Sequence, residues 1–221
     1  MFLFALLIFV YSQVLKGKEF HEKHKNKKFV KLTSESCIHN GVKYKEGRID
    51  DILDFDPTGS CKPGGLYFVE FDNFVHWMEY GGKKMVYLWD VEIPNDCEVY
   101  DEGNKYKTNC FIITNKINIW ESEELSLAAV KQDGWVLEFV QNQTPEICMA
   151  AVTQNGWALQ FVKVQTPEIC LAAVKQNGWA LKFVHNQTPE ICLAAVTQDG
   201  LALKFVHNKT PEICLASVKQ D

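Results

Sequence analysis

The chain has 221 residues, of which 47% are hydrophobic and 12% aromatic, a globular composition with enough apolar mass for one or two folded domains. Its net charge is −5, and its densest positive stretch is the lysine cluster at residues 16–28. The rest is acidic without a dense basic stripe, which argues against nucleic acid as the main partner.

The first fifteen residues, from Met1 to Leu15, are strongly apolar. Three interpretations stay open: a signal peptide cleaved near Ser12, a membrane anchor, or an extension. The stretch is shorter than the roughly 17–25 apolar residues of a membrane helix, and its positive charges follow it, which favours retention on the cytosolic side. We expect residues 1–28 to be this segment plus a solvated lysine-rich linker. Host cytoplasm or virion is the favoured location, with membrane tethering or secretion as alternatives.

Residues 29–120 predict a small α+β domain. Strand patterns occupy residues 29–33, 66–71, 85–93, 97–100 and 110–113, and a short helix is expected at residues 74–78, stopped by Gly81 and Gly82. Four cysteines, Cys37, Cys61, Cys97 and Cys110, lack metal-site spacing. They would permit disulfides in an exported protein, but the further cysteines downstream argue for a reducing compartment.

Residues 121–221 repeat with a period of 22, most visibly in the cysteines at positions 148, 170, 192 and 214. In one repeat, Thr166 is placed as an N-cap and Pro167 at the first helical position. An apolar run to Val174 predicts a helix of about ten residues. Asn177-Gly178 should then end it through a left-handed conformation, before a second helix of about eight residues. Four such repeats and a truncated fifth predict an all-α solenoid of short helix pairs.

Comparing the repeats with one another separates an expected core from an expected surface. Two of the apolar slots, which barely change, hold Trp135, Trp157, Trp179 and Leu201, and Phe139, Phe161, Phe183 and Phe205. The candidate binding residues come from polar slots that vary: Glu138, Lys163, Lys182, His185, Lys204 and His207. The alternative is an ordinary solvated helix face. The repeat cysteines predict core packing rather than a metal site, and no motif predicts a cofactor.

The fifth repeat stops before its second helix. We therefore expect Ile213, Leu215 and Val218 to be partly uncovered. That end should self-associate, pack on another element of the chain, or fray.

The repeat segment NQTPEICLAAVKQNGWALKFV resembles a short repeat found in arrays in proteins of giant, mimivirus-type viruses and some protists. The resemblance covers residues 122–221. The segments NGVKYKEGR, FDPTGSCKPGGLYF and EIPNDCEVY are similar to the region that precedes ankyrin and related repeats in the same viruses, over residues 29–120. The resemblance implies a viral protein–protein interaction or scaffold protein without enzymatic activity.

One enzymatic alternative remains. Gly65-Leu66-Tyr67-Phe68, followed by a short helix and Tyr80-Gly81-Gly82, is similar to a strand and helix of ADP-ribosyltransferases. That resemblance implies that His39 contacts the nicotinamide ribose, Tyr67 stacks, and Glu92 or Glu98 is the acid. A turn leading into a core strand explains the same residues, so a non-catalytic interaction protein is preferred, and a membrane-tethered interaction module is the other alternative.

Overall fold

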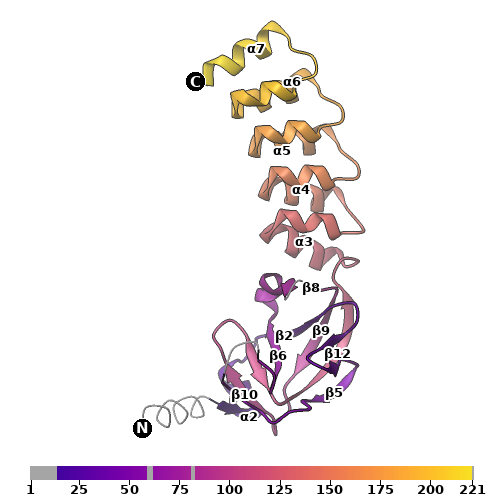
Figure 1. Cartoon of the computed structure of the whole chain (residues 1–221), viewed down its shortest axis with the longest axis vertical. Coiled ribbons are helices and arrows are strands. Elements are labelled where there is room, and N and C mark those ends of the chain that lie inside the picture. The colour runs from indigo at the N-terminus through magenta and orange to yellow at the C-terminus, as the bar shows by residue number, and fades with distance from the viewer. Residues whose placement is uncertain (1–13, 59–61, 81–82, 221) are drawn as a thin grey trace. The chain divides into compact units, whose positions relative to one another are not determined.

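The computed structural model describes residues 14–58, 62–80 and 83–220. They form two compact bodies, an N-terminal domain ending at Ile119 and a repeat array beginning at Trp120 (Figure 1). The predictions that concern residues 1–13, Cys61 and residues 81–82 lie outside the described part of the chain. Within the described ranges, no helix is long and apolar enough to cross a membrane.

The N-terminal domain consists mainly of short antiparallel strands. They are β1 (Val14–Lys16), β2 (Phe29–Thr33), β3 (Ile38–His39), β4 (Val42–Lys43), β5 (Gly47–Asp50), β6 (Leu66–Glu70), β7 (Glu79–Tyr80), β8 (Lys83–Lys84), β9 (Tyr87–Glu92), β10 (Glu98–Asp101), β11 (Tyr106–Thr108) and β12 (Cys110–Asn118). Eight of these described strands form one sheet in the order β1-β10-β11-β6-β2-β9-β12-β5. An α-helix, α2 (Gly17–Lys23), and a 3-10 helix, η1 (Phe71–Trp77), pack with them.

The sheet curls round because one nearly continuous strand belongs to both of its halves. Only Asn109 separates β11, which pairs with β6, from β12, which pairs with β9. Since β6 and β9 both pair with β2, these strands enclose a common core. A disulfide between Cys97 and Cys110, with Cα atoms 5.5 Å apart, links the starts of β10 and β12.

The lysine-rich segment is part of this domain, so the prediction of a solvated linker at residues 16–28 is wrong. Val14–Lys16 pairs with β10, and α2 follows directly. Phe20 of α2 is fully buried, with its ring centroid 4.9 Å from that of Phe29 and 5.3 Å from that of Tyr106. The lysines of this segment are exposed, while the Phe20 side chain packs into the core and holds α2 in place. A segment rich in lysine can therefore still belong to a folded domain, because the charged ends of its lysines stay in solvent.

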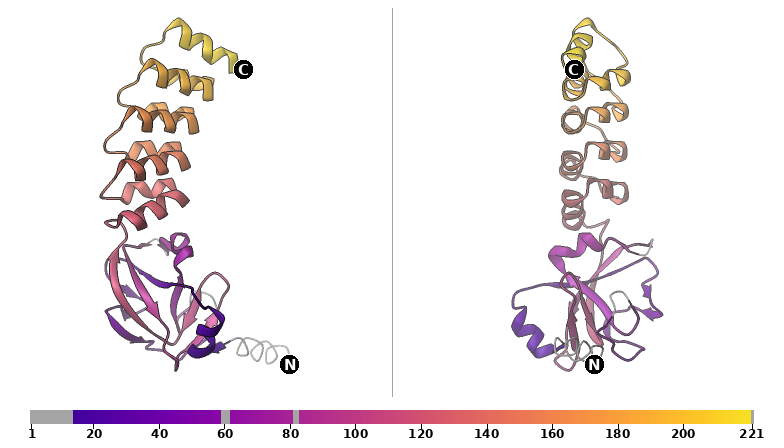
Figure 2. Two further views of the ribbon diagram at one scale, coloured as in Figure 1. Left: turned by 180° about the vertical axis from the view of Figure 1, so that it is seen from behind. Right: turned by 60° about the vertical axis from the view of Figure 1, so that its left-hand side comes forward.

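The repeat array alternates α-helices with 3-10 helices. The elements are α3 (Glu123–Gln132), η2 (Gly134–Phe139), α4 (Pro145–Gln154), η3 (Gly156–Phe161), α5 (Pro167–Gln176), η4 (Gly178–Phe183), α6 (Pro189–Gln198), η5 (Gly200–Phe205), α7 (Pro211–Ser217) and η6 (Val218–Gln220). Each α-helix packs on the next α-helix and each of η2 to η5 on the next 3-10 helix, which gives the two columns in Figure 2. The predicted fold class, α+β followed by an all-α short-repeat array, is confirmed.

The predicted helix starts are also confirmed. The side chain of Thr166 accepts a hydrogen bond from the backbone N–H of Ile169, and Pro167 occupies the first turn. The other threonines of this slot, Thr144, Thr188 and Thr210, cap in the same way, and so does Ser122. These local contacts satisfy a backbone donor that has no partner within the helix.

In the first four repeats, the second half differs from the prediction. It is a six-residue 3-10 helix rather than an eight-residue helix, and the side chain of Asn177 caps it by accepting from the N–H of Trp179. Gly156 and its equivalents are not among the described glycines with positive φ, so the left-handed ending is wrong. A Cβ on Gly156 would instead lie 2.6 Å from the carbonyl oxygen of Ala173, so the glycine is required by the next repeat's close approach.

In the fifth repeat, the prediction of uncovered apolar residues holds in part. Leu215 and Val218 are 57% and 63% exposed. Ile213 is only 3% exposed because α7 still packs on α6 and η5, which contradicts the prediction for that residue.

Candidate interaction surface

Glutamine side chains join neighbouring repeats. Gln165 donates from Nε2 to the carbonyl of Phe183 at 2.8 Å, and its Oε1 accepts from the N–H of His185 at 3.1 Å. Gln143 and Gln187 make the equivalent pair of bonds to the following repeat. Lys209 stands in this slot in the next copy and donates to Val206 of its own repeat. Each glutamine therefore satisfies one donor and one acceptor of a backbone segment outside regular ladders.

A second glutamine slot bonds in the opposite direction. Gln154 Oε1 accepts from the N–H of Gly134, and Gln176 Oε1 accepts from that of Gly156, each reaching the preceding repeat. These bonds need the close approach that the glycines permit. The repeats therefore interlock through polar as well as apolar contacts, which stiffens the surface that they present.

The aromatic side chains form a partly exposed row, which we call the aromatic ladder: Trp135 with Phe161, Trp157 with Phe183, and Trp179 with Phe205. In each pair, the tryptophan packs edge-to-face on the phenylalanine of the following repeat at 5.6 Å between ring centroids. Such pairs combine apolar burial with a defined ring geometry.

The expectation that the tryptophan slot belongs to the core holds only in part. Trp135 is 45% exposed, Trp157 and Trp179 are half-buried, and Leu201 is 68% exposed. The buried seam of the array is formed by smaller side chains: Ile147, Cys148, Ala151, Val152, Ala158, Leu159, Val162 and their equivalents. The 22-residue period did not distinguish the buried seam from the tryptophan slot, because the residues of both vary little from one repeat to the next.

All six candidate binding residues are exposed, but they belong to two surroundings. Lys204 lies over the aromatic ladder, with Nζ 3.4 Å from the ring centroid of Trp179. Lys182 and Glu138 occupy the same slot in earlier repeats. Lys163 donates to the carbonyl of Gln141 at the connection between repeats, and its slot also holds His185 and His207.

Trp179 shows how a ladder position is held. Its ring contacts Phe205, its indole Nε1 donates to Asp199 Oδ2 at 2.6 Å, and Lys204 covers its face. All three partners belong to the following repeat. The ring is consequently oriented while part of it remains open to solvent, and an oriented aromatic loses little conformational entropy when a partner binds.

The repeat cysteines have a packing role. Cys170 is buried and donates to Gln165 Oε1 at 3.5 Å, and burial raises the pKa of its thiol above the usual value. Cys148 and Cys192 make the same contact, and burial raises the pKa of each of their thiols too. A thiol held protonated in this way is a poor nucleophile.

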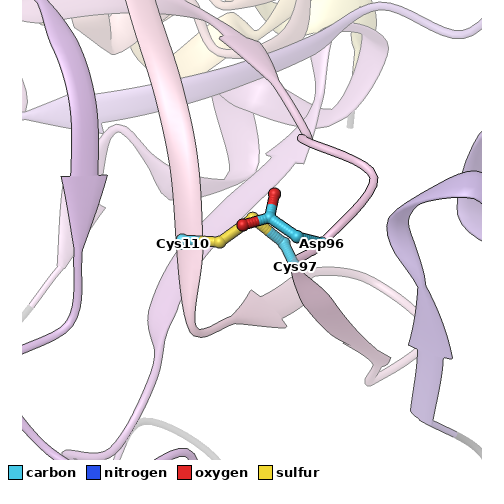
Figure 3. A group of neighbouring side chains, drawn as sticks. All are labelled: Asp96, Cys97 and Cys110. Carbon is cyan, nitrogen blue, oxygen red and sulfur yellow. A yellow bond between two sulfur atoms is a disulfide. The ribbon is translucent and has the colours of Figure 1, made fainter.

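In the N-terminal domain, Asp96, Cys97 and Cys110 form the described group whose atoms lie close enough for a metal ion (Figure 3). The two sulfurs are joined in the disulfide, and Asp96 Oδ2 accepts from Arg48 Nη2 at 2.9 Å. The thiolates that a soft metal needs are thus absent in this state, and the carboxylate already faces a cation. This pairing is one of the disulfides that the sequence left open.

The transferase residues are only partly brought together. His39 and Tyr67 line the same pocket, of about 210 Å³, with Trp77, Lys31 and Lys105. Glu92 and Glu98 are not among its lining residues, and Glu98 instead accepts from Lys16 Nζ at 2.7 Å. The pocket therefore pairs the predicted aromatic with cations in place of the required acid.

The comparisons with known proteins agree with this architecture. Residues 122–165, 144–189 and 166–210 match the family model described as "Domain of unknown function (DUF4116)". Acanthamoeba polyphaga mimivirus supplies two relatives. "Putative ankyrin repeat protein R868" is 26% identical over 127 residues, covering 47% of this chain and 61% of that protein. "Uncharacterized protein R869" is 33% identical over 72 residues, covering 32% and 49%.

The chain is similar to giant-virus repeat proteins. The resemblance noted in the sequence is thereby confirmed, and it rests on the overlapping repeat matches. The chain spans about half to three-fifths of the length of these two relatives. No solved structure matches it.

Proposed function

We propose that the repeat array is a non-catalytic scaffold that binds a protein partner through the aromatic ladder and the charged slot beside it. The observation that carries the proposal is the row of tryptophans that remain partly exposed although each is fixed by the next repeat. Tryptophan is enriched among residues that dominate binding energy at protein interfaces. The name of the mimivirus relative R868, which refers to ankyrin repeats, is consistent with such a role.

The charge beside the ladder favours a partner segment that is acidic at one end. The slot changes from Glu138 through Gln160 to Lys182 and Lys204. An extended segment lying along the ladder would gain from carboxylates over the two lysines and lose from carboxylates over Glu138. Such complementarity orients a partner and raises its association rate more than it raises affinity.

The test is a peptide-display selection on the full chain, followed by affinity measurement of the selected peptides. We expect peptides with an acidic end and apolar side chains, and a loss of about tenfold or more in affinity for the variant Lys182→Glu/Lys204→Glu. The matched control is Lys131→Glu/Lys175→Glu, which makes the same charge change at exposed positions on the α-helices. Equal losses in the two variants would indicate a long-range charge effect and contradict the proposal.

A second variant, His185→Ala/His207→Ala, tests the slot at the repeat connections. A loss of affinity there with none at Lys182 and Lys204 would move the binding surface away from the ladder. Circular dichroism of each variant checks that the array remains folded.

A further inference from the structure

The pocket in the N-terminal domain opens where two strands of the sheet part. β2 pairs with β6 only through Phe29 with Glu70 and Val30 with Val69. Beyond Val30, β2 continues beside β9, whereas the first half of β6 continues beside β11. Among the described residues, the pairing of β2 with β6 ends at these two pairs, and the pocket of about 210 Å³ lies against both strands.

The pocket is lined from both faces of the sheet. Two of the lining side chains lie on the core side of the sheet: that of Lys31, which follows Val30 on β2, and that of Phe68 on β6. Tyr67, on the other side of β6, and Trp77, at the end of η1, add aromatic surface. None of the described lining residues carries a carboxylate, while two of them are lysines.

The two lysines differ in whether a carboxylate lies beside the ammonium group. Lys105 is 4% exposed, pairs with Glu102 at 3.4 Å and lies over the rings of Tyr67 and Trp77. Lys31 is 5% exposed, and its contact is the ring of Tyr44, 4.8 Å from Nζ. A buried ammonium without an anion carries a large desolvation cost. Lys31 is thus the group in this pocket that an anionic ligand would stabilise.

We propose that this pocket is a binding site for a small aromatic carboxylate, whose single negative charge faces Lys31 and whose ring lies among Tyr67, Phe68 and Trp77. One uncompensated cation matches one negative charge, because Lys105 is already paired with Glu102. The pocket is smaller than the roughly 300–1,000 Å³ of drug-sized ligand sites, so a ligand with one ring fits its size.

The site is separate from the proposed protein-binding surface, since all of these residues belong to the N-terminal domain. In this site Tyr67 contacts the ring of the ligand, and no catalytic carboxylate of the kind that a transferase would need takes part. The stacking surface and the cation together select for charge and for a flat apolar body.

The test is isothermal titration calorimetry of the full chain at pH 7 with three probes: p-toluate, its neutral amide p-toluamide, and phenyl phosphate. We expect p-toluate to bind about tenfold or more tighter than p-toluamide, and tighter than the doubly charged phosphate ester. In Lys31→Met, the preference for p-toluate over p-toluamide should fall to about equality, while p-toluamide still binds. Lys43→Met, at an exposed lysine of β4, is the matched control and should keep the preference.

Proton uptake gives an independent readout. Burial lowers the pKa of Lys31 to about 7, so at pH 8 much of this amine is neutral before the ligand binds. A carboxylate beside it should draw in a proton, visible as a binding enthalpy that changes with the ionisation enthalpy of the buffer, and Lys31→Met should abolish this change.

Four results would each overturn the proposal. The first three are no binding of p-toluate at millimolar concentration, a preference for p-toluate that survives in Lys31→Met, and loss of binding of both p-toluate and p-toluamide in that variant. The third of these would assign Lys31 a purely structural role. Preferred binding of phenyl phosphate would replace the carboxylate with a phosphate ester as the ligand class and equally reject the proposal as stated.

Discussion

Replacing Gln165 with methionine tests whether the glutamine bonds between repeats hold the array together. Methionine keeps the length of the side chain but removes the bond to the carbonyl of Phe183 and the bond from the N–H of His185. Each lost backbone hydrogen bond costs about 1 kcal/mol, and more where water cannot replace it. We therefore expect the free energy of unfolding of the array to fall by about 2–3 kcal/mol.

Urea denaturation and native-state hydrogen exchange provide the assay. The control is Gln160→Met, because Gln160 is exposed and its hydrogen bond in the described part of the chain goes to the carbonyl of Trp157 within its own 3-10 helix. Its effect should stay within about 0.5 kcal/mol. The exchange of the His185 amide should accelerate in Gln165→Met alone. Equal unfolding midpoints for the two variants, together with unchanged protection of His185, would refute the role assigned to Gln165.

Three further changes test the other structural assignments. Gly156→Ala places a methyl group against the carbonyl of Ala173 and should lower the stability of the array by at least about 1–3 kcal/mol in thermal unfolding, whereas a purely conformational glycine with negative φ would tolerate alanine. Phe20→Ala should destabilise the N-terminal domain by about 3–5 kcal/mol. An unchanged melting temperature would instead support the prediction that residues 16–28 are a solvated linker. Burial lowers the pKa of Lys31 from 10.5 to about 7 in the folded state, so between pH 7 and pH 10 the unfolded chain holds a proton that the folded chain has lost. The wild type should therefore gain stability relative to Lys31→Met as the pH rises over this range, by up to about 1.4 kcal/mol per pH unit. A stability difference that does not depend on pH would contradict this assignment.

The helix starts of the array could be predicted from single repeats. Thr166 and Pro167 act on the backbone of their own turn, so their effect does not depend on the rest of the chain. The same is true of Asn177, whose position as a break was correct. The role of the following glycine was not predictable in this way, because it is set by an atom of the next repeat.

The candidate surface was only partly predictable. Exposure of Lys182 and Lys204 follows from their variation between repeats, but the exposure of Trp135 does not. Its slot is apolar in all repeats because each ring packs on a neighbouring ring, and a residue can be fixed by packing while half of it stays in solvent. In the N-terminal domain, nothing local to Lys31 indicates that its charge is buried in a gap between strands.

By itself, the sequence determined the 22-residue period, the capped helix starts and the order of a β-rich domain before a helical array, since these depend on local backbone preferences and on repetition. Only the tertiary structure decided that α2 belongs to the domain, that the second helix is 3-10, that the tryptophans of the array stay partly exposed and that Lys31 lies in a pocket. Each of these depends on which surface another segment covers, and that is a property of contacts between residues far apart in the chain.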